Sequence, residues 1–140
     1  MTYEQWEAGV PDVIRRDSLW KMEAYRLGLF LSDLGWRDAG KLARDRRTVG
    51  IADQLYPAVG KISSNFGEGY SRASGKERAH FYEYALGSAR EARDWYHKGR
   101  GVLSEAVVKH RLDLCARIVR LALKMIARER TSNRKVSPAP

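Results

Sequence analysis

The sequence has little that would support a covalently cross-linked, secreted or membrane-bound protein. Its one cysteine, Cys115, cannot form an internal disulfide. The longest uncharged apolar run, Leu27–Leu31, is far shorter than the roughly 20 residues that a membrane-spanning helix needs. The N-terminal stretch MTYEQWEAGV lacks the basic start and apolar segment of a signal peptide. We therefore expect a cytoplasmic protein that does not engage a membrane.

Catalytic and metal-binding patterns are also missing. The pairs Glu77-x-x-His80 and Asp94-x-x-His97 resemble half-sites of di-iron bundles. Such sites need the pairs on two different helices, and both of these pairs lie on one predicted helix. Cys115 falls on an apolar stripe, which favours packing over nucleophilic chemistry. The sequence predicts no enzyme, no metal and no cofactor, and a metal- or cofactor-dependent bundle enzyme is a distant alternative.

What the chain does contain is positive charge, spread unevenly. The 140 residues suit one domain and carry a formal net charge of +9. Residues 1–35 hold four Lys/Arg and six Asp/Glu, a net charge of −2, so the basic excess lies in the rest of the chain. A basic surface of this kind attracts phosphate backbones.

Apolar residues recur every three or four positions, the spacing of amphipathic helices. The pattern predicts four helices, over residues 17–34, 48–70, 74–98 and 104–130. Gly35 is expected to end the first, and the basic stretch 37–47 to be a connection, with or without a helical turn. Pro57 either bends the second helix or marks its true start. We expect an acidic extension over residues 1–16 and a disordered basic tail over residues 131–140.

Four helices with short connections predict an all-α fold, an antiparallel up-down-up-down four-helix bundle. Three tyrosines, Tyr25, Tyr82 and Tyr96, fall outside the main apolar stripes. Second apolar faces often mark a partner surface. The pattern therefore favours self-association.

Two groups of cations are candidates for binding nucleic acid. One is a stripe on the fourth predicted helix, Arg117, Arg120, Lys124 and Arg128, and the other is the cluster Arg44, Arg46 and Arg47. A charged stripe is often only the solvated face of a bundle. The excess of cations over acids is what a nucleic-acid surface requires. Because no aromatic side chains are interleaved with the stripe, we expect little reading of base identity.

Polar residues interrupt the apolar stripes of the second and third predicted helices at Asn65, Glu68 and Ser88. They could form a ligand or acid–base site, or a buried network that fixes helix register. A buried carboxylate must find donors, and Arg72, Arg90 or a backbone amide could supply them. The structural interpretation is favoured, since no nucleophile or second carboxylate lies at matching spacing.

The segment Gln54–Glu91 resembles a known family. Its motif residues are Gln54, Leu55, Asn65, Glu68, Gly69, Tyr70, Arg72, Ser74, Phe81, Ala85, Gly87, Ser88 and Glu91. The pattern is similar to that of bacterial four-helix-bundle proteins encoded in intervening sequences of 23S ribosomal RNA genes. That family includes the accessory variability protein of diversity-generating retroelements. Tyr56 and Pro57 stand where the family commonly has two basic residues.

The resemblance implies a four-helix bundle that assembles into a homopentamer. It implies that Asn65, Glu68, Gly69, Ser88 and Glu91 form a structural polar network. For the retroelement branch it implies binding to nucleic acid and to a reverse transcriptase. Our expectation is a non-catalytic, homo-oligomeric bundle that binds RNA or DNA backbones. The alternative is a protein-interaction scaffold with no nucleic-acid role.

Overall fold

The computed structural model describes residues 1–136, with side chains described through Thr131. Four long helices make up most of it: α3 (Glu23–Ala43), α4 (Val49–Tyr70), α5 (Gly75–Lys98) and α6 (Glu105–Val136). Three short elements precede them: α1 (Tyr3–Ala8), α2 (Asp12–Arg15) and the 3-10 turn η1 (Ser18–Lys21). The prediction of an all-helical protein is confirmed for these residues, none of which lies in a strand.

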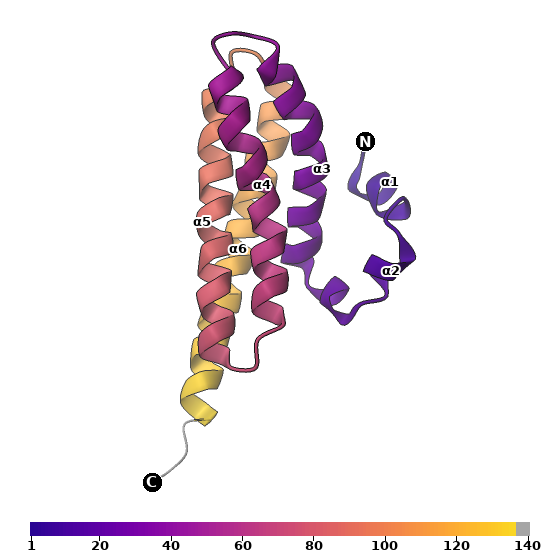
Figure 1. Cartoon of the computed structure of the whole chain (residues 1–140). Coiled ribbons are helices and arrows are strands. Elements are labelled where there is room, and N and C mark those ends of the chain that lie inside the picture. The colour runs from indigo at the N-terminus through magenta and orange to yellow at the C-terminus, as the bar shows by residue number, and fades with distance from the viewer. Residues whose placement is uncertain (137–140) are drawn as a thin grey trace.

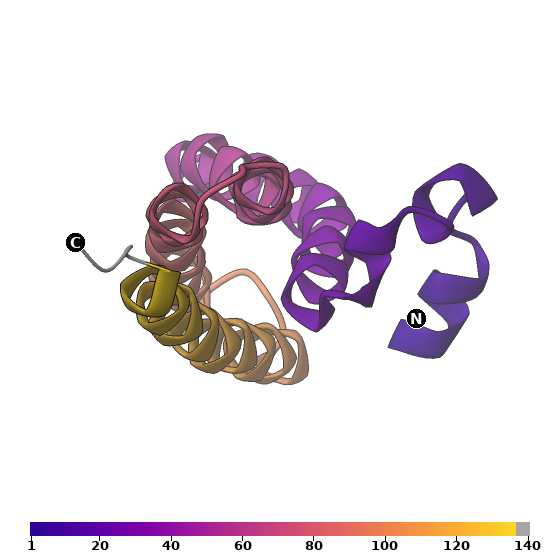
Figure 2. The same cartoon turned by 90° about the horizontal axis from the view of Figure 1, so that it is seen from below.

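The long helices run side by side around a shared core (Figures 1 and 2). The α3–α4 and α5–α6 connections lie at one end of the bundle, and the α4–α5 connection lies at the other (Figure 1). The core includes Leu31, Leu55, Ile62, Phe66 and Ile118, each shielded from solvent. Burial of this apolar surface is the main force that holds the helices together.

The predicted end of the first long helix is wrong. Gly35 does not stop α3, which continues to Ala43 and so takes in most of the stretch expected to be a connection. Gly35 instead lies against α4, where an added Cβ would come 2.7 Å from Cγ2 of Val59. The glycine is therefore a point of close helix–helix approach. Pro57 lies inside α4, which begins at Val49, so the second helix does not start at the proline.

The third long helix buries a wider band than the predicted stripe, of which Ala85 and Ala92 lie in the core as expected. Tyr82 and Tyr96 are buried, with 3% and 0% of their surface exposed, and Tyr25 packs partly buried against the same core. The expected stripe residues Phe81, Ser88 and Trp95 are only half-buried. These tyrosines therefore complete the core of the single chain, and they do not form the partner surface that the sequence suggested.

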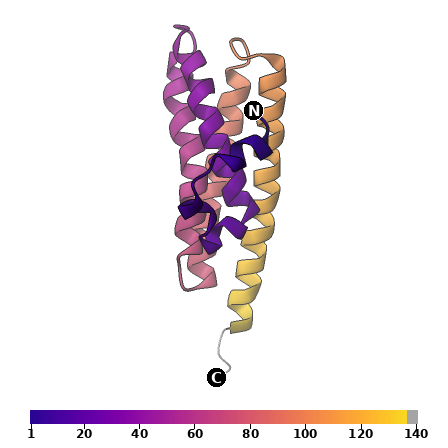
Figure 3. The same ribbon diagram turned by 90° about the vertical axis from the view of Figure 1, so that its right-hand side faces the viewer.

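The N-terminal segment packs on the outer side of α3 (Figures 2 and 3). Trp6 and Val10 form a small second core with Phe30 and Leu34 of α3. The Trp6 Nε1–H donates to Asp33 Oδ2 at 2.6 Å, which anchors α1 in place. Residues 1–16 are thus an ordered layer on the bundle.

The C-terminal helix is longer than predicted, since α6 continues from residue 131 to Val136. The first part of the expected disordered tail is therefore helical, and residues 137–140 of that prediction lie outside the described residues. None of the helices in the described part of the chain has the length and apolar character to cross a membrane.

Candidate nucleic-acid interface

The predicted basic stripe lies along α6. Arg117, Arg120, Lys124 and Arg128 are all exposed. Their spacing of three or four residues places them on one side of the helix. The stripe begins near the middle of α6 and runs toward the end of the bundle that holds the α4–α5 connection (Figure 1).

The predicted cluster Arg44, Arg46 and Arg47 lies in the α3–α4 connection, at the other end of the bundle (Figure 1). Arg47 forms an ion pair with Asp45 at 2.8 Å. The hydrogen bonds from the Arg47 side chain and backbone lower the pKa of Asp45 to about 2. The structure therefore does not join the cluster and the stripe into one patch, and one of the cluster's charges is already paired.

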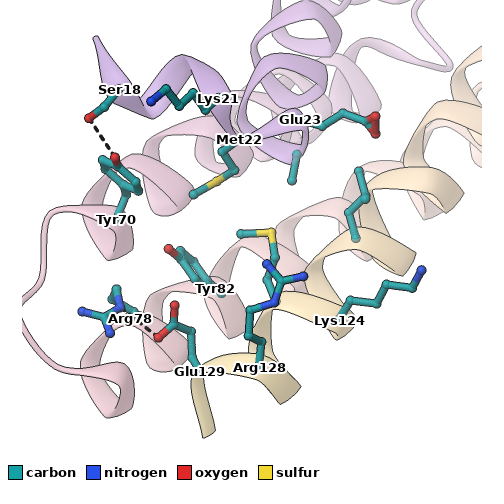
Figure 4. A pocket seen from close by; sticks show the side chains of 13 residues that line it. Ser18, Lys21, Met22, Glu23, Tyr70, Arg78, Tyr82, Lys124, Arg128 and Glu129 are labelled. Carbon is teal, nitrogen blue, oxygen red and sulfur yellow. Dashed lines mark hydrogen bonds and ion pairs between the residues drawn. The ribbon is translucent and has the colours of Figure 1, made fainter. Parts of the chain in front are cut away.

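An open groove of about 640 Å³ lies beside the second half of the stripe (Figure 4). Its apolar lining includes Met22, Leu121 and Met125. Lys124 and Arg128 of α6 and Lys21 of η1 lie along its border. None of these three cations forms an ion pair with a carboxylate of residues 1–131. The groove thus combines an apolar lining with three cations that are unpaired among residues 1–131, and the two carboxylates that also line it, Glu23 and Glu129, are paired with other arginines.

Two other cations near the groove are neutralised by the fold. Arg117 donates from Nη2 to both carboxylate oxygens of Glu23, at 2.7 and 2.5 Å. Arg78 pairs with Glu129 at 2.9 Å and also donates to backbone carbonyls of the α4–α5 connection. The stripe is consequently uneven: Arg117 has an acidic partner, whereas Lys124 and Arg128 have none among residues 1–131.

The main buried polar network was not found from the sequence. Asp38 of α3 is fully buried and accepts hydrogen bonds from Tyr96 Oη of α5 and Arg111 Nε of α6, both at 2.7 Å. Arg111 Nη2 donates to the second Asp38 oxygen at 3.2 Å. Burial, together with the neighbouring Asp38 carboxylate, raises the pKa of Tyr96 above its ordinary range. The network links three helices and satisfies a buried charge on each side.

The polar network predicted from Asn65, Glu68, Gly69, Ser88 and Glu91 is wrong in its location. Glu68 and Glu91 are exposed. Glu68 pairs on the surface with Arg72, one of its predicted donors, and Asn65 Nδ2 donates to the carbonyl of Lys61 in its own helix. Gly69 is buried under the ring of Tyr82, whose Cε1 would lie 2.7 Å from an added Cβ. The glycine therefore lets α4 and α5 pack closely, and the carboxylates lie outside the core.

The other candidates considered for chemistry were Cys115 and groups of metal-ligating side chains. Cys115 is buried, and burial raises the pKa of its thiol to about 12. Within the described residues, no three His, Cys, Asp or Glu side chains gather in a way that could hold a metal ion. The feature that stands out for binding is the groove beside α6 with its unpaired cations.

Fold and groove together define a bundle of four long helices with exposed cations along α6. The sequence profile of the 23S rRNA-intervening sequence protein family matches residues 22–124. The chain belongs to that family, as its motif residues suggested. The matched region begins just before α3 and ends within α6, so it takes in α3, α4 and α5 whole. Comparison with curated proteins and with solved structures finds no significant match.

Proposed function

We propose that this chain is a non-catalytic, up-down-up-down bundle that binds the phosphate backbone of RNA or DNA through α6. The observation that carries the proposal is the uncompensated charge at the groove: Lys21, Lys124 and Arg128 approach it without a carboxylate partner among residues 1–131. Arg120 adds a further exposed cation to the same helix. Flexible cations of this kind hold phosphates without reading sequence.

Family membership extends the proposal to assembly and partners. We infer that the bundle forms a homo-oligomeric ring, most simply a pentamer, and that it acts beside a reverse transcriptase as an accessory protein. A ring would repeat the α6 surface on every subunit, so a long nucleic acid could contact several copies at once. Sedimentation at micromolar protein tests the assembly, and a monomer there would overturn the ring.

The nucleic-acid proposal is tested by reversing two charges, Arg120→Glu with Lys124→Glu. Binding to mixed-sequence RNA and to duplex DNA is measured at several salt concentrations. For duplex DNA the slope of log affinity against log salt should become shallower by about 1.8, or about 0.9 for each lost phosphate contact. All sequences should lose affinity alike.

The matched control reverses two exposed arginines of α5, Arg90→Glu with Arg93→Glu, which changes the net charge equally. If this control weakens binding as much as the α6 variant does, net charge and not the stripe governs affinity. If the unaltered protein binds neither nucleic acid at low salt, the proposal fails and a protein-interaction scaffold takes its place.

A further inference from the structure

A second surface combines exposed aromatic rings with positive charge. Trp36 of α3 is 71% exposed and Tyr56 of α4 is 41% exposed. Their rings pack edge to face, with centroids 5.7 Å apart. Trp6 is buried, and Trp20 and Trp95 are half-buried, so Trp36 is the most exposed tryptophan of the chain. Because most of the Trp36 indole is not buried by its own fold, the ring is available to a ligand.

The surroundings of this pair are cationic. An open cavity of about 740 Å³ beside the rings is lined by Arg37, Lys41 and Arg44 and by the single carboxylate Asp53. Arg37 and Lys41 lie one turn apart on α3, and Arg44 is the residue that caps its C-terminal end, so the three cations form a short row beside Trp36. None of them pairs with a carboxylate in the part of the chain whose side chains are described.

The rest of the cavity's lining has short side chains. Small residues, Ala39, Gly40, Ala43 and Ala52, line it. A Cβ added at Gly40 would meet nothing within 4 Å, so the space beside the rings is open. An apolar protein partner would require a broader apolar surround, whereas here the rings are bordered by cations and small side chains. A planar, negatively charged ligand fits this combination.

We propose that Trp36 and Tyr56 form a stacking platform for unpaired bases of single-stranded nucleic acid, with Arg37, Lys41 and Arg44 holding its phosphates. Base–aromatic stacking works with every base because each has a π-face, and a row of cations can track the backbone. The inference rests on the proposed function for the class of ligand, but it concerns a surface on α3 and α4 and not the α6 groove. It assigns this chain a preference for unpaired strands that a phosphate-binding stripe alone would not give.

The test compares two labelled probes of equal length, a thymidine oligonucleotide and an abasic oligonucleotide with the same phosphates. The unaltered protein should bind the thymidine probe about tenfold more tightly, the size expected for loss of one stacked base. Trp36→Ala should abolish this preference and leave affinity for the abasic probe unchanged. Tryptophan fluorescence should be quenched by the thymidine probe and much less in the variant.

A second variant separates stacking from any effect on folding. Gly40→Leu places a side chain in the open space beside the rings and should also remove the thymidine preference. Because leucine has a higher helix propensity than glycine, this substitution should preserve α3. The control is Gly87→Leu on α5, another exposed helical glycine whose added Cβ meets nothing within 4 Å. This control should keep the preference.

The outcomes distinguish this platform from the α6 site. If the unaltered protein binds both probes equally, the platform is overturned, whatever the α6 double reversal does. If Trp36→Ala weakens both probes alike and also changes the sedimentation of the protein, the surface is an interface between protein chains and the platform is again overturned. If the thymidine preference depends on Trp36 but the α6 reversal has no effect, the platform stands and the α6 site fails.

Discussion

Arg111 and Lys124 lie on the same helix, and the bundle treats their charges in opposite ways. Arg111 is 7% exposed and meets Asp38 across the core. Lys124 is exposed at a groove where no described carboxylate meets it. The residue type does not decide which cation is structural; the presence of an acid on the facing helix does. On α6, Arg111 is thus paired inside the fold, whereas Lys124 has no carboxylate partner among the residues whose side chains are described.

The largest effect should come from removing the buried acid. Asp38→Ala leaves the Arg111 guanidinium buried without a counter-charge, and we expect the free energy of unfolding to fall by about 3–5 kcal/mol. Urea denaturation measures this loss. The triple variant Asp38→Leu, Arg111→Met, Tyr96→Phe should recover most of it, because no charge then remains in the core. A loss below about 1 kcal/mol for Asp38→Ala would mean that the Asp38–Arg111 pair contributes no more to stability than an exposed ion pair does.

A second effect, from titratable groups buried in the core, should appear at alkaline pH. Burial raises the pKa of Cys115 from 9.0 and that of Tyr82 from 10.0, each to about 12, and raises that of Tyr96 further. Between pH 9 and 12 the unfolded chain therefore releases protons that the native chain retains, so unfolding becomes easier as pH rises. Denaturation midpoints measured from pH 8 to 11 should fall, and Cys115→Ala should reduce the part of the decline that begins near pH 9. A midpoint independent of pH over this range would contradict the burial of these groups.

The proposed role of the α6 stripe can be tested by freeing one more of its cations. Glu23→Gln removes the partner of Arg117, a pair that is partly exposed and so contributes little to stability. The freed Arg117 should join the stripe, raise affinity for duplex DNA and steepen the salt slope by about 0.9, the contribution of one phosphate contact. Fluorescence anisotropy at several salt concentrations measures the change. Glu91→Gln, an exposed acid of α5, is the control for net charge. Equal gains in both variants would show that no specific cation was released.

The smallest effect is expected at Glu68. Its pair with Arg72 is exposed and spans one helical turn, so Glu68→Ala should cost only about 0.3–0.5 kcal/mol. Thermal unfolding followed by circular dichroism would show it. A loss several times larger would mean that Glu68 is buried in the working assembly, as it would be at a contact between subunits.

The fold was largely predictable because amphipathic periodicity carries it. The spacing of apolar residues located α4 and α5 within a residue at each end and the start of α6 equally well. The prediction failed where one residue type can have two structural roles. Gly35 looked like a helix stop, but the same missing side chain lets α3 approach Val59. Tyr82 and Tyr96 lay beside the predicted stripe because a helix that faces two neighbours buries a wider band than one stripe.

The candidate sites were less predictable because the sequence does not show which charged residues lie next to one another in the folded chain. Lys124 and Arg128 could be named from the sequence, but their lack of a partner could not, and Arg117 beside them was already paired. Asp38 fell in a stretch expected to be a connection, so its burial was missed. A signal did exist, since Asp38 lies three residues after Gly35 and four after Leu34, on a continuing helical face.

The sequence by itself determined the helical class, the family and the positions of the main helices, because local periodicity and motif residues are written along the chain. Only the tertiary structure decided which charged side chains are paired within the protein and which stay exposed without a partner. That choice depends on residues far apart in sequence: Asp38 with Arg111, Glu23 with Arg117, and Trp36 with Tyr56. Pairing across helices sets the local field and the burial of each group, and neither can be read from the neighbours of a residue in the chain.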